Sequence, residues 1–251
     1  MFPIINLGPL SLPSPAIILL LGFWLGSYLT ERFAKSIKID PGVLEKVLWT
    51  SMFAGLIGAR LSFVARFPTA FQGDWSSLIS LNPAFLDPFG GLVIAIAIAF
   101  MVLSKQDLSI MVYFDGLTPF FGTMILAFFL SQFSSGSGHG ILAEIPWGIY
   151  LWGGIRHPVQ LYFAFGSIVL LTVIMTVQSI KLYPPGYVFL LFITVSAGFG
   201  LFFSYFQVTN FPTFKGLRVD QILIWMLFIA GIYYLNKVFS SHIEGLNESN
   251  K

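Results

Sequence analysis

The sequence contains no cysteine, few histidines and little charge, and each shortage excludes a class of site. Without cysteine, the chain can form no disulfide, no thiolate metal site and no cysteine nucleophile. Only three of its 251 residues are histidine, and they are not at metal-ligand spacing, so we expect neither a metal nor a cofactor. The formal net charge is +2, which is too small to predict a nucleic-acid partner.

The composition predicts an integral membrane protein. Hydrophobic residues make up 56% of the chain, charged residues only 10%, and the mean hydropathy is +0.84, whereas a soluble domain carries about 25% charged residues. A membrane-crossing helix needs about 20 apolar residues, and the alternating pattern of a membrane barrel is absent. We therefore predict an all-α protein with about seven transmembrane helices near residues 14–33, 44–65, 87–104, 110–131, 158–178, 185–206 and 219–239.

The apolar stretches follow one another so closely that we predict a single transmembrane domain over residues 1–239, followed by a polar tail over 240–251. The first stretch has no preceding basic residue and no small-residue cleavage site, so we expect a retained helix rather than a signal peptide. Basic residues favour the cytoplasmic side of a membrane. Placing the N-terminus outside and the C-terminus in the cytoplasm leaves more of them on that side: Arg32, Lys35, Lys38, Lys46, Lys105, Lys181, Lys237 and Lys251, against Arg66, Arg156, Lys215 and Arg218.

Two charged residues fall within the predicted spans, where charge is costly and often functional. Arg60 lies in GLIGARLSFV, and its guanidinium is a candidate for binding an anion such as a lipid phosphate. It could instead extend outward or pair with Asp115. For Asp115, in MVYFDGLTPF, we favour a structural role beside Pro119, because one acid alone makes no site.

Glycines and polar residues mark two further candidate regions. Gly90 and Gly91 begin the third span and allow close approach of either a ligand or a helix. The polar residues Arg156, His157 and Gln160, with Tyr162, lie at the start of the fifth span. They could line a cavity or form the polar and aromatic belt at the membrane surface.

The order of these motifs resembles the prolipoprotein diacylglyceryl transferases of bacterial inner membranes, over most of the chain. The matching segments are GARL at 58–61, FGGL at 89–92, Asp115 with Pro119, PWG at 146–148 and RHPVQLY at 156–162. The resemblance implies a multi-pass protein of the inner (plasma) membrane. It also implies a family reaction, in which diacylglyceryl passes from phosphatidylglycerol to the lipobox cysteine of a prolipoprotein and glycerol phosphate leaves. Cationic groups would stabilise that departing phosphate.

The sequence departs from the family pattern where this chemistry belongs. In the resemblance, Ala95 stands for a histidine and Phe129 for an arginine, while Gln132 and Ser137 stand for an asparagine and an acid. The sixth helix lacks two arginines and an acid, and has in their region Gly198, Leu201, Phe202, Ser204 and Gln207. Apolar replacements need no partner in a membrane cavity, but they cannot neutralise a phosphate.

We therefore predict a catalytically degenerate member of this family that retains lipid binding. The candidate catalytic residues are Arg60 and His157, and the candidate lipid-binding residues are Arg60, Gly90, Gly91, Arg156, His157, Gln160 and Tyr162. The expected partner is an anionic phospholipid such as phosphatidylglycerol, with lipoprotein signal segments or other membrane proteins as further candidates. The alternatives are a divergent but active transferase and a non-catalytic subunit of a membrane complex.

Overall fold

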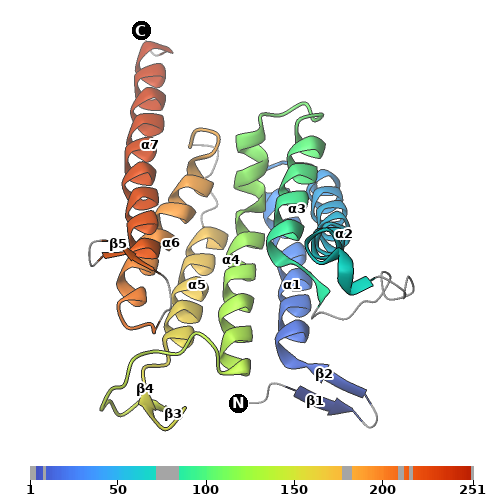
Figure 1. The fold of residues 1–251 in the computed structure, drawn as a ribbon. Coiled ribbons are helices and arrows are strands. Elements are labelled where there is room, and N and C mark those ends of the chain that lie inside the picture. Colours follow the sequence, from blue (N-terminus) through green and yellow to red (C-terminus); the bar gives the residue numbers. More distant parts are fainter. Residues whose placement is uncertain are drawn as a thin grey trace. The chain divides into compact units, whose positions relative to one another are not determined.

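The computed structural model describes residues 4–7, 10–71, 85–176, 183–208, 212–214 and 217–249. Within these ranges the chain forms seven α helices (Figure 1): α1 Ser14–Ser36, α2 Pro41–Arg66, α3 Pro88–Leu103, α4 Ile110–Ser135, α5 Val159–Thr176, α6 Tyr187–Ser204 and α7 Val219–Ser249. Six of them are long and apolar enough to cross a membrane, and α3, with 16 residues, is shorter. The structure thus confirms the prediction of an all-α membrane protein with about seven helices.

Two of the helix starts use the same local signal, an aspartate followed by proline. Asp40 accepts a hydrogen bond from Gly42 N at 2.9 Å at the start of α2, and Asp87 accepts one from Phe89 N at 3.2 Å at the start of α3. The carboxylate satisfies a backbone donor that has no partner within the helix. The following proline needs no such partner and has a φ suited to the first helical turn.

One short hairpin precedes α1, and two others connect α4 with α5 and α6 with α7. The strand β1 (Ile4–Leu7) pairs with β2 (Leu10–Pro13), β3 (Ile149–Leu151) with β4 (Gly154–Arg156), and β5 (Thr213–Phe214) with β6 (Leu217–Arg218). A 3-10 turn, η1 (Pro68–Phe71), follows α2. The β3–β4 turn has positive φ at Trp152 (52°) and Gly153 (82°), as a two-residue hairpin turn of this type requires.

The chain divides into two compact units: the first is Asp40–Tyr113, and the second is Met1–Ile39 together with Phe114–Lys251. In the first unit, α2 packs on α3 through small residues. A Cβ added to Gly91 would lie 2.8 Å from both the Ala59 Cβ and the Gly55 carbonyl oxygen, and one added to Gly58 would lie 2.7 Å from Ile94. Small residues at such spacing allow membrane helices to approach closely.

The second unit has its core between α1, α4, α5 and α6. The buried side chains at its centre are Phe33, Leu170, Ile174, Val188 and Phe192. The helix α1 approaches α4 closely at Gly22, because glycine has no side chain there. A Cβ on Gly22 would lie 2.2 Å from the Cβ of Ala127. The phenylalanine-rich sequence thus supplies the volume of this core, and glycines set where its helices come closest.

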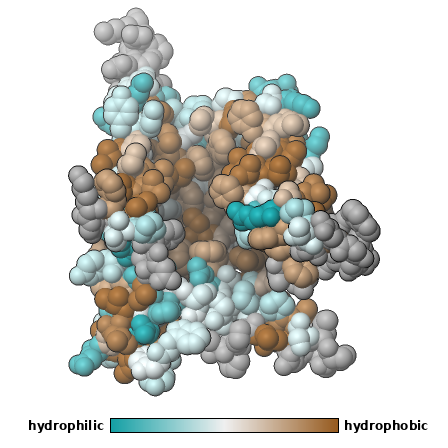
Figure 2. Space-filling model, viewed as in Figure 1, coloured by the Kyte–Doolittle hydropathy of each residue, from teal (hydrophilic) through white to brown (hydrophobic). Residues whose placement is uncertain are grey.

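The helix α7 packs on α6 and is otherwise peripheral. Its candidate span is only 6% buried, and Leu223 and Met226 are among its exposed side chains. Figure 2 shows hydrophobic side chains over much of the visible face of the helices, as expected of a surface in contact with lipid. The helix continues through Ser249, into the predicted polar tail. The single-domain organisation and the orientation of the termini remain predictions.

Candidate functional site

A small layer of extended chain lies next to the start of α5 and holds most of the candidate residues in the second unit. The residues around Ile141 pair on one side with β4, where Ala143 N donates to Ile155 O at 3.0 Å and His157 N donates to Ile141 O at 3.1 Å. On the other side Ile141 N donates to Phe206 O at 2.8 Å. A Cβ on Gly140 would lie 2.4 Å from the His157 carbonyl oxygen. This glycine is therefore needed for packing. It is the last residue of the polar segment SSGSGHG at 134–140, whose first two residues end α4; this segment is called the 134–140 loop.

Within this layer, His157, Tyr162 and Trp147 form one hydrogen-bonded chain. Trp147 Nε1 donates to the Tyr162 hydroxyl at 2.8 Å, and that hydroxyl lies 3.1 Å from His157 Nδ1. The His157 ring also packs against Phe206, with 4.8 Å between ring centroids. The sequence motifs PWG and RHPVQLY, which carry the family resemblance, thus meet in space through these three side chains.

This chain of bonds engages one nitrogen of His157. Because the indole N–H of Trp147 can only donate, the Tyr162 oxygen accepts there. Its own hydrogen can point to His157 Nδ1, or its second lone pair can accept from a protonated Nδ1, according to the imidazole tautomer. In both cases Nδ1 is occupied by Tyr162.

Arg156 and Gln160 both hold backbone segments together. Arg156 Nε donates to Leu151 O at 3.0 Å and its Nη1 to Gly140 O at 3.3 Å, so the guanidinium ties β3 to the 134–140 loop. Gln160 is 2% exposed and donates to Ser137 O at 2.6 Å. Both contacts are structural. The burial of Gln160 follows from its position at the start of α5, beneath the loop.

Aromatic rings occupy the space between α4, α5 and α6 beside this layer. Phe129 stacks face to face on Phe163, with centroids 4.1 Å apart and planes at 3°, and Phe163 meets Phe203 at 5.4 Å. Tyr162 also contacts Phe203, at 5.7 Å. Phe129 is the position where the family resemblance places an arginine. The ring stack fills this position with apolar volume.

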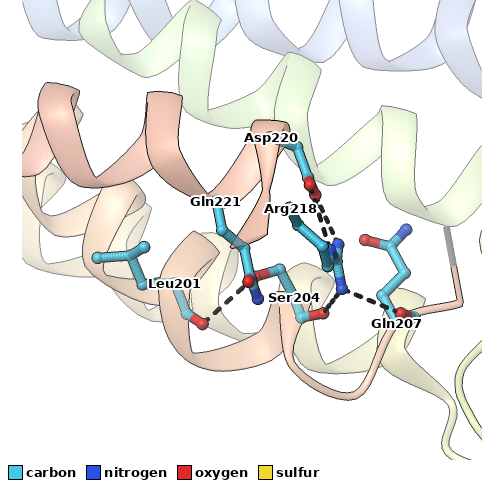
Figure 3. A network of polar contacts seen from close by, with 6 residues as sticks. All are labelled: Leu201, Ser204, Gln207, Arg218, Asp220 and Gln221. Carbon is cyan, nitrogen blue, oxygen red and sulfur yellow. Dashed lines mark hydrogen bonds and ion pairs between the residues drawn. The ribbon is translucent and has the colours of Figure 1, made fainter. Parts of the chain in front are cut away.

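Figure 3 shows a polar network that sequence reasoning missed, around Arg218 between the end of α6 and the start of α7. Arg218 donates to both carboxylate oxygens of Asp220, at 3.2 and 2.5 Å, and to the carbonyl oxygens of Ser204 and Gln207 at 2.8 and 3.3 Å. Gln221 adds a bond to the Ser204 hydroxyl at 3.4 Å. The only sequence signal was an Arg-x-Asp triplet before an apolar run.

In the first unit, Arg60 on α2 lies among aromatic rings and backbone oxygens. Its Nη1 donates to Phe85 O at 2.8 Å, and the guanidinium carbon lies 5.2 Å from the Phe71 ring and 5.5 Å from the Phe85 ring. Cation–π contacts of this kind help to hold a guanidinium in place. Anion binding by Arg60 stays a prediction.

A second set of polar contacts next to Arg60 centres on Asp87. The Ser62 hydroxyl donates to Asp87 Oδ2 at 2.7 Å, and Arg66 Nη1 lies 3.8 Å from the same oxygen. The hydrogen bond from Ser62 is the main cause that holds the pKa of Asp87 below its ordinary value. The Phe89 N–H and the charge of Arg66 also lower this pKa, whereas partial burial raises it. This carboxylate is therefore ionised at neutral pH and neutralises part of the local positive charge.

Gly90, Gly91 and Ala95 belong to the contact between α2 and α3. A Cβ on Gly90 would lie 2.2 Å from the Ser62 side chain, and the Ala95 Cβ lies 3.0 Å from the position of a Cβ on Gly55. The resemblance places a histidine at Ala95. An imidazole in this rotation of α3 would meet the backbone of α2, so the alanine fits the close packing of the two helices.

Asp115, on α4, holds the start of α6. Its two carboxyl oxygens accept from Gly186 N at 2.6 Å and from Phe189 N at 2.9 Å, and the side chain is 5% exposed. These N–H groups have no helical partner in the first turn, so Asp115 supplies it from another helix. The structure agrees with the structural role favoured from the sequence.

The structure brings Arg156, His157, Gln160 and Tyr162 together in one unit, and places Arg60, Gly90 and Gly91 in the other. Their lipid binding stays a prediction. No group of three or more His, Cys, Asp or Glu residues that could hold a metal occurs among the described residues.

Helices of this length and composition, joined by short hairpins, define a multi-pass membrane protein. A sequence model of the prolipoprotein diacylglyceryl transferase family matches residues 3–236, and the chain belongs to this family.

Three curated relatives are similar over nearly their whole length, and each is named phosphatidylglycerol–prolipoprotein diacylglyceryl transferase. The Clostridioides difficile protein is 24% identical over 242 residues, covering 94% of this chain and 90% of the relative. The Streptococcus uberis protein is 25% identical over 242 residues, with 92% of each covered. The Finegoldia magna protein is 21% identical over 216 residues, with 86% and 87% covered. The fold is thus shared while most side chains differ.

Proposed function

We propose that this chain is a lipid-binding member of the transferase family that has lost diacylglyceryl transfer. The relatives are named for transfer from phosphatidylglycerol to prolipoprotein. In that reaction a thiol attacks the glycerol carbon of the lipid, the carbon–oxygen bond to phosphate breaks, and glycerol phosphate leaves with both electrons. Cationic donors must meet the departing phosphate, and a base must receive the thiol proton.

The ring stack of Phe129 on Phe163, at 4.1 Å, is the observation that carries this proposal. The resemblance places an arginine at Phe129, and a phenyl ring in face-to-face contact leaves neither charge nor space for a phosphate there. Removing one such donor typically costs about 10²–10³ in rate. The apolar Leu201 and Ala95, at two other family positions, would add to that loss.

The cation near the end of α6 does not replace the missing arginines. Arg218 reaches the carbonyls of Ser204 and Gln207, in the region where the resemblance places an acid and an arginine, but Asp220 binds it with two oxygens. A paired guanidinium contributes little net charge to a leaving group. The Nδ1 atom of His157 is occupied by the Tyr162 hydroxyl at 3.1 Å and is therefore not open to a substrate thiol.

Anionic phospholipid binding is the property that the remaining residues support. Arg60 lies against the Phe85 carbonyl and the Phe71 and Phe85 rings, and a guanidinium can bind a phosphate with two parallel hydrogen bonds. We place the protein in the bacterial inner membrane, with the C-terminus in the cytoplasm, and phosphatidylglycerol as its expected ligand. Lipoprotein signal segments or other membrane proteins are the candidate protein partners.

The transferase proposal is tested with purified protein, phosphatidylglycerol and a labelled lipobox peptide. We expect no glycerol phosphate release above that of a protein-free control, with an active family member as the positive control. Steady turnover that disappears in His157→Ala would overturn the proposal and establish a divergent active enzyme. Activity that persists in the variant would indicate a contaminant.

Lipid binding is tested separately, by partition into vesicles and by headgroup competition. We expect Arg60→Leu to weaken selectivity for phosphatidylglycerol over phosphatidylcholine about tenfold, and Arg60→Lys to weaken it less, since lysine keeps the charge but loses the fork. The matched control is Lys46→Leu, which removes an exposed cation from the same helix. Equal losses in the Arg60 and Lys46 variants would show nonspecific charge attraction and remove Arg60 as a site. If the unmodified protein shows no selectivity for phosphatidylglycerol, the lipid-binding proposal fails, and the alternative of a non-catalytic subunit of a membrane complex remains.

A further inference from the structure

The helices α5 and α6, which lie side by side in Figure 1, enclose a cavity of about 330 Å³. Seven of its ten lining residues are Val, Leu or Ile, and the others are Phe199, Tyr183 and Tyr187. None of these side chains is charged, so the cavity offers no counter-charge to a polar or ionic ligand. The absence of charge distinguishes this cavity from the candidate headgroup site, where Arg60 carries a positive charge.

The cavity has a firm inner wall and an open outer wall. Leu170, Ile174 and Val188 belong to the core of the unit and are at most 6% exposed, so they cannot move aside easily. Val169 and Val173, on the outer side of α5, are 41% and 48% exposed. In a membrane their exposed surfaces face lipid, and a chain from the bilayer can enter between them and α6.

The chemistry and size of the cavity select a hydrocarbon chain. If each carbon of an acyl chain takes up about 30 Å³, the cavity of about 330 Å³ holds on the order of ten of these carbons. A partner helix, about 10 Å across, does not fit. Water would find only the two tyrosine hydroxyls as partners, and an apolar cavity of this kind stays free of water.

One end of the cavity is marked by two aromatic side chains that suit a membrane surface. The Tyr183 and Tyr187 rings stack with centroids 4.8 Å apart and planes at 4°, at the start of α6. Tyrosines are enriched where hydrocarbon meets the polar headgroups. A chain lying in the cavity would therefore have its polar end next to these residues.

We propose that the cavity between α5 and α6 holds one acyl chain of a membrane phospholipid, with its headgroup at the Tyr183–Tyr187 end. In the predicted topology this end faces the cytoplasm, so the lipid comes from the inner leaflet. The site requires neither Arg60 nor His157 and goes beyond the proposed headgroup site. The chain completes the packing of α5 on α6 beside Val188.

The test uses the full chain in phosphatidylglycerol vesicles that contain a small fraction of lipid with a photoactivatable acyl chain. Crosslinked positions are mapped by peptide mass spectrometry. In Val173→Phe the added ring fills the open side of the cavity. The matched control is Ile168→Phe, since Ile168 is on the same helix, is also 48% exposed and is not among the lining residues.

We expect crosslinks on the lining segments of α5 and α6 in the unmodified protein. Val173→Phe should reduce them at least about fivefold by occupying the space of the chain, while Ile168→Phe should leave them within about twofold. Labelling of exposed residues on α7, such as Leu223, should stay equal in all three proteins as a measure of bulk lipid. If Val173→Phe does not fold, Leu191→Phe narrows the same cavity from α6.

Three outcomes would overturn the proposal. Labelling of the cavity no greater than that of α7 would show ordinary lipid contact. Equal labelling in the Val173 and Ile168 variants would place the chain elsewhere. Labelling by a photoactivatable free fatty acid but not by the phospholipid would assign the cavity to another ligand. Arg60→Leu should leave the cavity labelling unchanged, so failure of the headgroup site and failure of this proposal are distinguishable.

Discussion

The helix pairs α2–α3 and α5–α6 are packed in opposite ways. In α2–α3, glycines and alanines bring the backbones together, and a Cβ on Gly91 would lie 2.8 Å from the carbonyl oxygen of Gly55. In α5–α6, a Cβ on Gly166 would lie 3.1 Å from the ring of Phe199, and an apolar cavity of about 330 Å³ lies nearby. One pair is closed by small residues, whereas large side chains leave space in the other.

This difference shows how two helix contacts in one membrane protein can serve different purposes. In lipid, association depends on close packing and on polar contacts rather than on removal of apolar surface from water. The α2–α3 pair has the close packing. The helix α6 is held by polar contacts at both of its ends, where Asp115 of α4 binds its start and Arg218 of β6 binds the carbonyl of its last residue, Ser204. Variants can therefore test the two kinds of contact separately.

The largest effect is expected from Asp115→Ala. The N–H groups of Gly186 and Phe189 lose their acceptor in a buried place, which costs roughly 3 kcal/mol, at the upper end of the range for unsatisfied donors. Asp115→Asn keeps one acceptor oxygen and should lose about half as much. The measurement is unfolding in mixed micelles by SDS titration. If Asp115→Ala were as stable as the unmodified protein, the start of α6 would not depend on this contact.

A smaller effect is expected from Gly91→Ala, with Gly166→Ala as its matched partner. Both changes gain up to about 1 kcal/mol from the higher helix propensity of alanine. The difference between their free energies of unfolding therefore reports the effect of the new methyl group on packing. At Gly91 the new methyl meets backbone and Ala59, which cannot move aside, and the net loss should be about 1–2 kcal/mol.

At Gly166 the new methyl meets the ring of Phe199, which lines the cavity and can shift into it. The stability of Gly166→Ala should therefore change by less than about 0.5 kcal/mol. Both variants are compared by the same SDS titration. Equal losses in the two would contradict the contrast between a closed and an open helix pair.

The smallest effect concerns Asp87, which lies at the end of the α2–α3 pair. Its folded pKa is lowered, chiefly by the Ser62 hydroxyl, so its contribution to stability is complete above the unfolded pKa near 4. That contribution is lost as the pH falls through the folded pKa. Ser62→Ala should move the loss to higher pH, as measured by thermal unfolding between pH 3 and 6. An unchanged pH profile in Ser62→Ala would show that the serine does not hold this carboxylate.

Much of the fold could be predicted from the sequence because each helix is a local feature. The apolar stretch near residues 44–65 became α2, Pro41–Arg66, and Asp40 before Pro41 set its start. The stretch near 219–239 was underestimated, since α7 continues to Ser249. Helix ends depend on weak capping and on neighbours, so polar composition alone was a poor guide to where α7 stops.

The candidate site was predicted less completely. The RHPVQLY motif led directly to His157 and Tyr162, and the structure places His157 Nδ1 3.1 Å from the Tyr162 hydroxyl oxygen. The role of Trp147, 15 residues before Tyr162, and that of Ser62, 25 residues before Asp87, could not be read from spacing. Such contacts connect different elements, and no periodicity in the sequence encodes them.

The sequence by itself determined that this protein lies in a membrane, where its helices fall and which family it belongs to, because hydropathy and motif order are properties of the chain. Only the tertiary structure decided which polar groups are already satisfied. Gln160 is buried beneath a loop, Arg218 is bound by Asp220, and Asp115 meets Gly186, 71 residues away. The cavity between α5 and α6 has the same origin, since empty space depends on how side chains from separate helices fit together.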